Sequence, residues 1–202
     1  MRLANPTTAA QYFHLLRRQA RIAKPRPLVV FTPKGLLRLP DAASKLSDLS
    51  EGSFQFVLDD PKISDKEKVT RLVLCSGKVY YDLAKHDRRE SAKNVALARV
   101  ELIYPFAKAQ LRELIETYPN LKEVVWVQEE PRNMGARAHM FPRLMQILPD
   151  HLHFGFIGRP ERASPGEGYP AAHTAEQNRI LRTALDLQIP VSLYPAKTPG
   201  QR

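Results

Sequence analysis

Cysteine and long apolar runs are both scarce in this sequence. Cys75 is the only cysteine among 202 residues, so no disulfide can form within the chain, and the lack of disulfides is typical of a reducing compartment. No apolar run approaches the roughly 20 residues of a membrane-spanning helix, and the N-terminal segment lacks the apolar stretch and cleavage site of a secretory signal. We therefore expect a soluble, cytoplasmic protein with no membrane partner.

Acidic residues are absent from the first 40 positions. This segment carries eight lysines and arginines, whereas the whole chain has a net charge of +10, which leaves +2 for residues 41–202. A basic arm of this kind suits nucleic-acid phosphates, a phosphorylated small molecule or an acidic protein surface. Because the rest of the chain is charge-balanced and lacks interleaved aromatic residues for base stacking, we expect no nucleic-acid partner.

Apolar periodicity predicts an α/β fold. Short β-prone runs alternate with segments of helical period, an order typical of a parallel sheet flanked by helices and joined by right-handed crossovers. The predicted strands cover residues 69–75, 95–101, 124–128 and 153–157, and the predicted helices cover residues 78–85, 108–118, 134–148 and 175–187.

The two ends of the chain do not follow this alternation. Asn5-Pro6 is a typical helix start, so we expect a helix over residues 7–20 and a short strand over residues 28–31, a unit too small to fold alone. Residues 188–202 hold three prolines and no period, and we expect a flexible tail there. The polar stretch 41–61 is predicted to be a linker with the docking residues Leu46, Leu49, Phe54, Phe56, Val57 and Leu58.

Ser76-Gly77-Lys78 stands where a predicted strand turns into a predicted helix. Backbone N–H groups and Lys78 at such a turn can hold a phosphate or a carboxylate. Glycine at this position also allows close packing without any ligand, and both interpretations stay open. Cys75 ends the buried strand, and we expect an unreactive thiol there.

Glu129 and Glu130 follow the apolar run 124–127. If the strand continues, the two carboxylates point to opposite sides, so we do not expect an acid/base pair. One would bind a backbone group or an arginine and the other would face solvent, a structural or interface role. The scattered histidines lack the spacing of a metal site, and no metal ligand is predicted.

Five basic residues cluster within ten positions, and they include Arg17, Arg18 and Arg26. On a helix, Arg17 and Arg21 share one face and Arg18 points elsewhere. The cluster is either the solvated C-terminal end of a helix, where cations are favoured, or a surface that binds an anion or a protein partner.

Seven segments together carry a family resemblance. In chain order they read ANPTT (4–8), YFHLLRRQ (12–19), PLVVFTPK (27–34), CSGKVYYD (75–82), RVELIYPF (99–106), WVQEEPRNMG (126–135) and GRP (158–160). In this order they closely resemble the C-terminal region of the thiamine-diphosphate-dependent decarboxylase component of 2-oxoglutarate dehydrogenase, the succinyl-transferring oxidoreductase of the tricarboxylic acid cycle.

The resemblance implies a domain organisation similar to that of transketolase. Residues 1–35 would be the end of the pyrimidine-binding domain, residues 36–187 the C-terminal α/β domain, and residues 188–202 a flexible tail. The family's enzymes use thiamine diphosphate and magnesium to decarboxylate 2-oxoglutarate and pass the succinyl group to a lipoyl arm. Their partners are the upstream domains, a second copy in a homodimer, and the succinyltransferase component with its lipoyl domain.

The motifs that carry this chemistry in the family are not found in the sequence. There is no GDG motif followed by an asparagine ligand and no GPEHSSAR-like segment, so we assign no catalytic, cofactor-binding or metal-binding residue to this chain. The resemblance therefore implies a structural or regulatory part of the enzyme that is inactive alone. The alternative is a free-standing interaction or regulatory module that docks through the helix starting at Asn5.

Resemblance to the actinobacterial branch adds an effector. Enzymes of that branch bind acetyl-CoA between their last two domains, which would place Arg18 and Arg26 near the CoA phosphates. Lys78 is a further anion-binding residue by this interpretation. Interface or structural roles are expected for Arg17, Glu129, Glu130 and Asn133.

Overall fold

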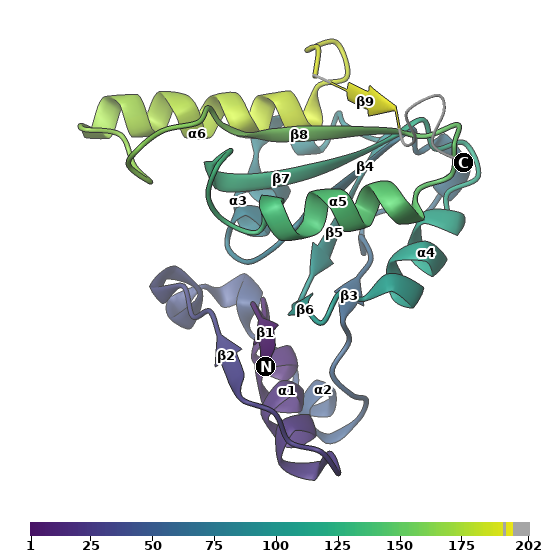
Figure 1. Ribbon diagram of the computed structural model, residues 1–202, viewed down its shortest axis with the longest axis vertical. Helices are drawn as coiled ribbons and strands as arrows, with labels where there is room; N and C mark the ends of the chain where they lie inside the picture. Colours follow the sequence, from purple (N-terminus) through teal and green to yellow (C-terminus); the bar gives the residue numbers. More distant parts are fainter. Residues whose placement is uncertain (192, 196–202) are drawn as a thin grey trace.

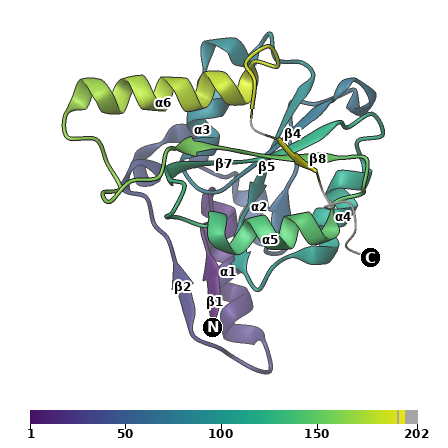
Figure 2. The same cartoon turned by 45° about the horizontal axis from the view of Figure 1, so that its top comes forward.

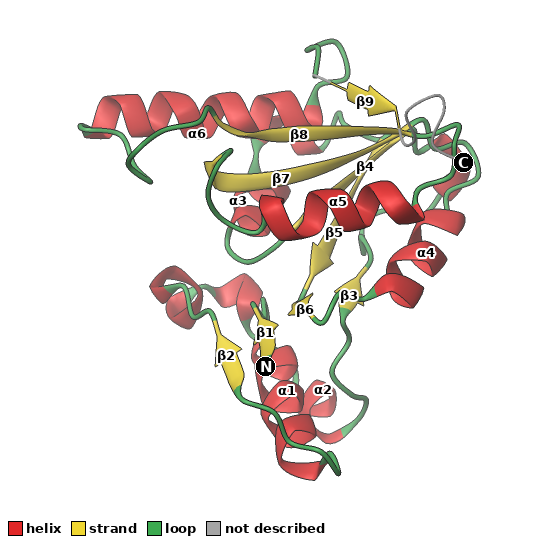
Figure 3. Cartoon of the chain, viewed as in Figure 1, coloured by secondary structure: helices red, strands yellow, loops and turns green. Residues whose placement is uncertain are grey.

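The chain forms a six-stranded sheet with helices on both faces and a three-stranded sheet beside it (Figures 1 and 3). The computed structural model describes residues 1–191 and 193–195. The strand order of the large sheet is β3 (Val57–Leu58), β5 (Val95–Val100), β4 (Arg71–Cys75), β7 (Glu123–Pro131), β8 (His153–Arg159) and β9 (Leu193–Pro195).

The predicted parallel sheet is confirmed for the four central strands. β5, β4, β7 and β8 are parallel, whereas the edge strands β3 and β9 pair antiparallel with β5 and β8. The sheet is therefore mixed. β3 and β9 have two and three residues, too few to show a period of two in the sequence.

The connections place a switch point beside β4. The chain runs from β4 to its neighbour β5 through α3 (Val79–Lys85), then returns across β4 to β7 through α4 (Lys108–Glu116). The carboxyl ends of β4 and β7 therefore flank the point where the strand order reverses, the place where open α/β sheets bind ligands.

Helices cover both faces of the sheet (Figure 2). One face packs on α4 and on α5 (Arg137–Ile147), and the other packs on α3 and on α6 (Pro170–Leu185). Successive residues of β7 alternate between the two cores: Trp126 belongs to the first and Val127 to the second. This explains the unbroken apolar run in the sequence, because a strand buried on both faces has no polar side.

Residues 1–31 form an N-terminal unit that supplies two of the three strands of the small sheet. β1 (Arg2–Ala4) pairs parallel with β2 (Leu28–Val30) and antiparallel with β6 (Leu102–Tyr104). The helix between them, α1 (Ala9–Arg21), is capped by the Thr8 hydroxyl, which accepts a hydrogen bond from Gln11 N at 3.2 Å. The helix therefore begins after Thr8, and the expected start at Asn5-Pro6 is wrong.

The stretch 41–61 wraps around α1. It contains α2 (Leu46–Ser50) and β3, and its backbone meets Gln11 through two hydrogen bonds with Gln55. Phe54 is buried as expected of a docking residue, whereas Leu46 is 81% exposed. Short 3-10 helices span Lys34–Arg38, Pro40–Ala42, Lys66–Lys68 and Asp87–Arg89.

The predicted C-terminal tail is only partly described. Leu193–Pro195 form β9, which was not expected, and residues 192 and 196–202 lie outside the described residues. The last helix begins at Pro170, five residues before its predicted start, with proline in its first turn, where no N–H partner is needed. Among the described helices, none combines the length and apolar character of a membrane span.

A buried ion pair joins the loop before β4 to the segment after α3, and its carboxylate also binds the sheet. Asp60 Oδ2 accepts hydrogen bonds from Arg89 Nη2 at 2.5 Å and from Leu97 N at 2.7 Å, and both charged side chains are almost fully buried. Asp60→Ala leaves the Arg89 guanidinium buried without its counter-charge. We expect the free energy of unfolding, measured with urea, to fall by about 3–5 kcal/mol.

Glu90→Ala is the matched control. Glu90 forms an exposed pair with Lys62, with 85% of its own side chain in solvent, and we expect its removal to leave the urea midpoint unchanged. Equal midpoints for Asp60→Ala and Glu90→Ala would contradict the structural role of the buried pair.

Candidate functional site

The Ser76-Gly77-Lys78 turn packs against the N-terminal unit. Gly77 has a φ of +72°, and a Cβ at this position would collide with the Asn5 side chain. Glycine is therefore needed both for the left-handed backbone and for the close approach of Asn5. This supports the packing interpretation of the glycine, and Lys78 still lines a cavity next to it.

Thr7 joins the N-terminal unit to the large sheet, and we call this contact the seam. Thr7 donates from its N–H and its hydroxyl to the two carboxylate oxygens of Glu101, at 2.8 and 2.6 Å. Its hydroxyl accepts from Arg99 Nη1 at 3.0 Å, and its carbonyl accepts from the Tyr81 hydroxyl at 2.6 Å. Every polar group of Thr7 is thus paired across the seam.

The seam holds a fully buried carboxylate. Burial raises the pKa of Glu101, against the lowering effect of the Thr7 hydrogen bonds and the Arg99 charge. Burial likewise raises the pKa of Tyr81 to about 12. Arg99 lies 4.3 Å from the centre of the Tyr80 ring. From the sequence, Arg99 and Glu101 were expected to lie in a strand and in the RVELIYPF segment, but no role was predicted for either side chain.

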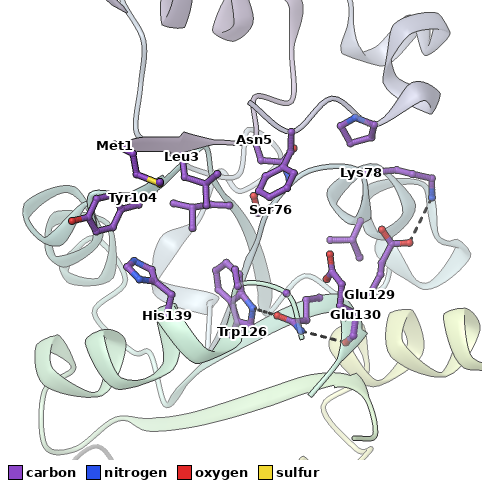
Figure 4. A pocket seen from close by; sticks show the side chains of 17 residues that line it. Met1, Leu3, Asn5, Ser76, Lys78, Tyr104, Trp126, Glu129, Glu130 and His139 are labelled. Atoms are coloured by element: carbon purple, nitrogen blue, oxygen red, sulfur yellow. Dashed lines mark hydrogen bonds and ion pairs between the residues drawn. The ribbon is translucent and has the colours of Figure 1, made fainter. Parts of the chain in front are cut away.

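A cavity of about 850 Å³ opens between the N-terminal unit and the carboxyl ends of β4 and β7 (Figure 4). Leu3 and Asn5 come from the N-terminal unit, Ser76 from the turn after β4, and Trp126 and Glu129 from β7. The cavity therefore lies at the switch point and at the seam. We call it the seam cavity, and it opens at the edge where open α/β sheets bind ligands.

Charged residues gather at one end of the cavity. The Lys78 ammonium pairs with Asp82 and lies 3.8 Å from Glu129 Oε1, which accepts from Gln177 Nε2 at 2.8 Å. Burial opposes the charged form of Lys78, but the hydrogen bond to Asp82 and the charge of Glu129 outweigh it and raise its pKa. Burial, reinforced by Asp82 and Glu130, raises the pKa of Glu129.

Glu129 and Glu130 both line the cavity, and their carboxylates have different neighbours. Glu129 Oε1 accepts from Gln177 of α6, whereas Glu130 Oε2 lies beside Gly135, in the turn that leads to α5. Because α6 and α5 cover opposite faces of the sheet, these contacts fit the alternation expected of strand residues. Glu129 is partly buried, whereas Glu130 is exposed.

Gln128 organises the turn after β7, a role that the sequence did not reveal. Its amide donates to Pro131 O at 3.1 Å and Met134 O at 2.8 Å, and its oxygen accepts from Trp126 Nε1 and Arg137 N, both at 3.0 Å. A polar residue at the end of an apolar strand was the one available signal.

Asn133 and Arg159 hold the loop after β8. Asn133 Nδ2 donates to Arg162 O at 2.9 Å, and its oxygen accepts from Arg162 N at 3.2 Å, so its structural contact is with a neighbouring loop. Arg159 Nε donates to both Glu167 oxygens, at 2.8 and 3.1 Å, and this hydrogen bond lowers the pKa of Glu167. In the sequence Arg159 was notable only within the GRP segment.

The three predicted anion-binding residues, Arg18, Arg26 and Lys78, lie at separate places in the structure. Arg17 and Arg18 line a second hollow of about 360 Å³ together with Phe56, whose ring centre lies 5.1 Å from the Arg18 guanidinium. Burial, reinforced by Arg2, lowers the pKa of Arg18. Lys78 belongs to the seam cavity, and Arg26 is exposed in the loop before β2. Within residues 1–191 and 193–195, no three His, Cys, Asp or Glu side chains are grouped to hold a metal ion.

Comparisons with known proteins agree on one family. The model for the 2-oxoglutarate dehydrogenase C-terminal family matches residues 43–185. The chain is 49% identical over 189 residues to a 2-oxoglutarate dehydrogenase E1 component of Bacillus subtilis, a match that covers 91% of the chain and 20% of the relative. It is 46% identical over 193 residues to the E1 component of an Exiguobacterium species, covering 93% and 20%. The chain thus spans about one fifth of these relatives.

The raised pKa of Glu101 makes the free energy of unfolding depend on pH. Because the folded-state pKa lies above the unfolded value, its contribution is most favourable below pH 4.5, the ordinary glutamate pKa, and is lost as the pH rises through the folded pKa. Glu101→Gln removes this dependence and retains an acceptor for Thr7 N. We expect urea unfolding to favour the variant over the wild type more strongly at pH 7 than at pH 5.

Glu116→Gln supplies the control, since Glu116 is an exposed residue of α4. Its difference from the wild type should stay constant between the two pH values. A Glu101→Gln difference that shrinks as the pH rises would show that the carboxylate is better stabilised charged than neutral.

Proposed function

The chain belongs to the 2-oxoglutarate dehydrogenase E1 family, and from this premise we propose that its 202 residues form the C-terminal, non-catalytic part of such an enzyme. The full enzyme decarboxylates 2-oxoglutarate and transfers the succinyl group to a lipoyl arm in the tricarboxylic acid cycle. Its partners are the domains that precede this region in the relatives, a second copy of the enzyme and a succinyltransferase. The cytoplasm is the compartment where this metabolism runs in bacteria.

The seam is the observation that carries the proposal. Residues 1–31 bring one helix and two short strands, too few to bury their own apolar faces, and Thr7 fixes them on the large domain. Tyr12, Phe13 and Leu16 of α1 remain 43–45% exposed. A domain that anchors the edge of a neighbouring catalytic domain has these properties, because the outer apolar face is then covered by the rest of that domain.

Thiamine diphosphate and magnesium are assigned to the other domains of the full enzyme. The seam cavity does not fit a magnesium diphosphate, because Lys78 is already paired with Asp82, and Glu129 and Glu130 add negative charge. When bound in the full enzyme, the cofactor supplies the carbanion chemistry. The role of this region is to hold the domains that bind it.

An acetyl-CoA effector suits the second hollow better than the seam cavity. Arg17 and Arg18 offer guanidinium groups for phosphates, and Phe56 offers a ring face beside them. Arg18→Gln in an active enzyme should abolish activation by acetyl-CoA and leave the basal rate unchanged, as measured by the rate at saturating 2-oxoglutarate with and without acetyl-CoA. Equal activation in both proteins would remove Arg18 from this role.

A free-standing interaction module is the alternative, and the exposed apolar face of α1 is what favours it. The two functions differ in the protein that the chain must bind. A scaffold works only with the catalytic domains of an E1 component, whereas a module associates with an unrelated enzyme. Size-exclusion chromatography of the chain with the separately expressed N-terminal four fifths of the Bacillus subtilis relative distinguishes them, because only a scaffold should co-elute.

Fusion to that relative tests the proposed function directly. We expect the 202-residue chain alone to release no CO₂ from 2-oxoglutarate in the presence of thiamine diphosphate, magnesium and an artificial electron acceptor. The Bacillus subtilis region that precedes the match should also be inactive alone, and fusing it to this chain should restore turnover. Calorimetric titration of the chain with thiamine diphosphate should give no stoichiometric heat.

The result that would overturn the proposal is turnover by the isolated chain. A folded fusion that binds thiamine diphosphate but stays inactive, beside an active native relative, would equally contradict it. The native relative is the positive control for the assay.

A further inference from the structure

Helix α1 carries apolar side chains on its exposed face and polar side chains on its buried face. Gln11 and His14 are buried beside Leu15, and both hydrogen-bond to the stretch 41–61. A surface helix in its final surroundings turns its apolar stripe toward the core and its charged residues toward water. In Figure 1, α1 lies below the large sheet, apart from α5 and α6. Its exposed apolar face therefore requires a further surface to cover it.

The spacing of the outward residues fits a single helix. Ala9, Phe13, Leu16 and Ala20 are all exposed, and they follow one another at intervals of four, three and four residues. This spacing is typical of the narrow seam between two helices that pack at a shallow angle. The two alanines leave room at both ends for the second backbone. We call these four residues, together with the neighbouring Tyr12, the α1 strip.

Two arginines follow one side of the α1 strip. At 3.6 residues per turn, Arg17 and Arg21 lie one above the other beside Leu16 and Ala20. Both are exposed, and in the part of the chain that the structure describes neither guanidinium forms an ion pair or a hydrogen bond. The covering surface therefore needs apolar side chains along its middle and carboxylates opposite the C-terminal end of α1.

A second copy of α1 does not meet this requirement. In an antiparallel pair of copies, Arg17 and Arg21 would face a first turn that holds no acidic residue. In a parallel pair the arginines of the two copies would face each other and repel. Because the first 40 positions contain no acidic residue at all, the rest of the N-terminal unit supplies no carboxylate either.

We propose that the α1 strip packs against one antiparallel helix that has acidic residues in its first two turns. Apolar residues of this helix contact Phe13 and Leu16, and its carboxylates pair with Arg17 and Arg21. The antiparallel direction places the acidic turns at the partner's own N-terminal end, where the helix dipole also favours them.

The source of the acidic helix rests on the proposed function. The chain spans about one fifth of the relatives that it matches, and the family model that covers residues 43–185 is that of a C-terminal region. We therefore assign the helix to the region that precedes this chain in such enzymes. Its packing on the α1 strip buries the exposed side chains Tyr12, Phe13 and Leu16.

Four synthetic helical peptides test the chemistry of the partner. Three share leucines at the four-three-four spacing and carry glutamate, glutamine or lysine in their first two turns, and the fourth is the glutamate peptide with its leucines scrambled. Binding to the full 202-residue chain is measured by fluorescence anisotropy. The glutamate peptide should bind about tenfold more tightly than the glutamine peptide at low salt, because it forms two exposed ion pairs. The lysine and scrambled peptides should bind more weakly than both.

A double variant tests the two arginines, and α4 offers a matched control. Arg17→Gln with Arg21→Gln should make the affinities for the glutamate and glutamine peptides equal. Lys108→Gln with Arg112→Gln removes two exposed charges at the same four-residue spacing on another helix. This control should keep the tenfold preference.

Thiol labelling tests the source. Burial raises the pKa of Cys75 to about 12, so the native chain should react little with iodoacetamide. Ala20→Cys places a thiol on the α1 strip. We expect this thiol to react at least tenfold more slowly in the fusion with the Bacillus subtilis region than in the 202-residue chain, each rate being taken relative to that of the same protein unfolded in urea.

Each way of failing has its own signature. Equal binding of the glutamate and lysine peptides, or a preference that persists without Arg17 and Arg21, would overturn the acidic partner. A fusion that turns over 2-oxoglutarate while the Ala20→Cys thiol reacts as in the isolated chain would overturn the assignment of the helix and leave the proposed function standing. Slower labelling of the isolated chain as it dimerises would assign the strip to a second copy. An inactive fusion counts against the proposed function, and the peptide affinities still decide the chemistry of the strip.

Discussion

The hydrogen bonds between Thr7 and Glu101 are the constraint on which the rest of the structure depends. They join the segment before α1 to the end of β5, and the pairing of β1 with β6 continues the same contact along the backbone. A buried carboxylate is costly unless it is hydrogen-bonded, and Thr7 supplies two of the three donors that Glu101 has. The position of the N-terminal unit is therefore fixed by a group that cannot be left unpaired.

The seam cavity follows from this fixed position. The N-terminal unit is held over the carboxyl ends of β4 and β7, and the Gly77 backbone lets Asn5 approach the turn after β4. On the other side, Glu129 and Glu130 of β7 reach the same cavity. The cavity thus depends on the left-handed glycine of the turn after β4 and on the end of β7 beside it.

The sequence predicted the long, periodic elements and missed features that tertiary contacts decide. The central strands and the helices between them were predictable because burial on both faces leaves continuous apolar runs, as at Val124–Val127. The short strands β1, β3, β6 and β9 were not, since two or three residues have no period and owe their conformation to a neighbour. β2 is equally short and was predictable only because it lies in the apolar run 28–31. The same limit applies to the site. Glu101 pairs with Thr7, which lies 94 residues away, while Gln128 and Arg159 hold irregular turns whose course no periodic pattern predicts.

Covering of the α1 face and closure of the seam are thermodynamically linked. A surface that binds the exposed apolar face of α1 only when the N-terminal unit is attached stabilises the attached state, by an amount set by its concentration and affinity. The linkage is reciprocal, so the hydrogen bonds of Thr7 to Glu101 that hold the unit in place also strengthen the contact that covers α1. In an enzyme where this unit is the edge of a catalytic domain, the seam would therefore act on domain attachment without touching the reacting atoms.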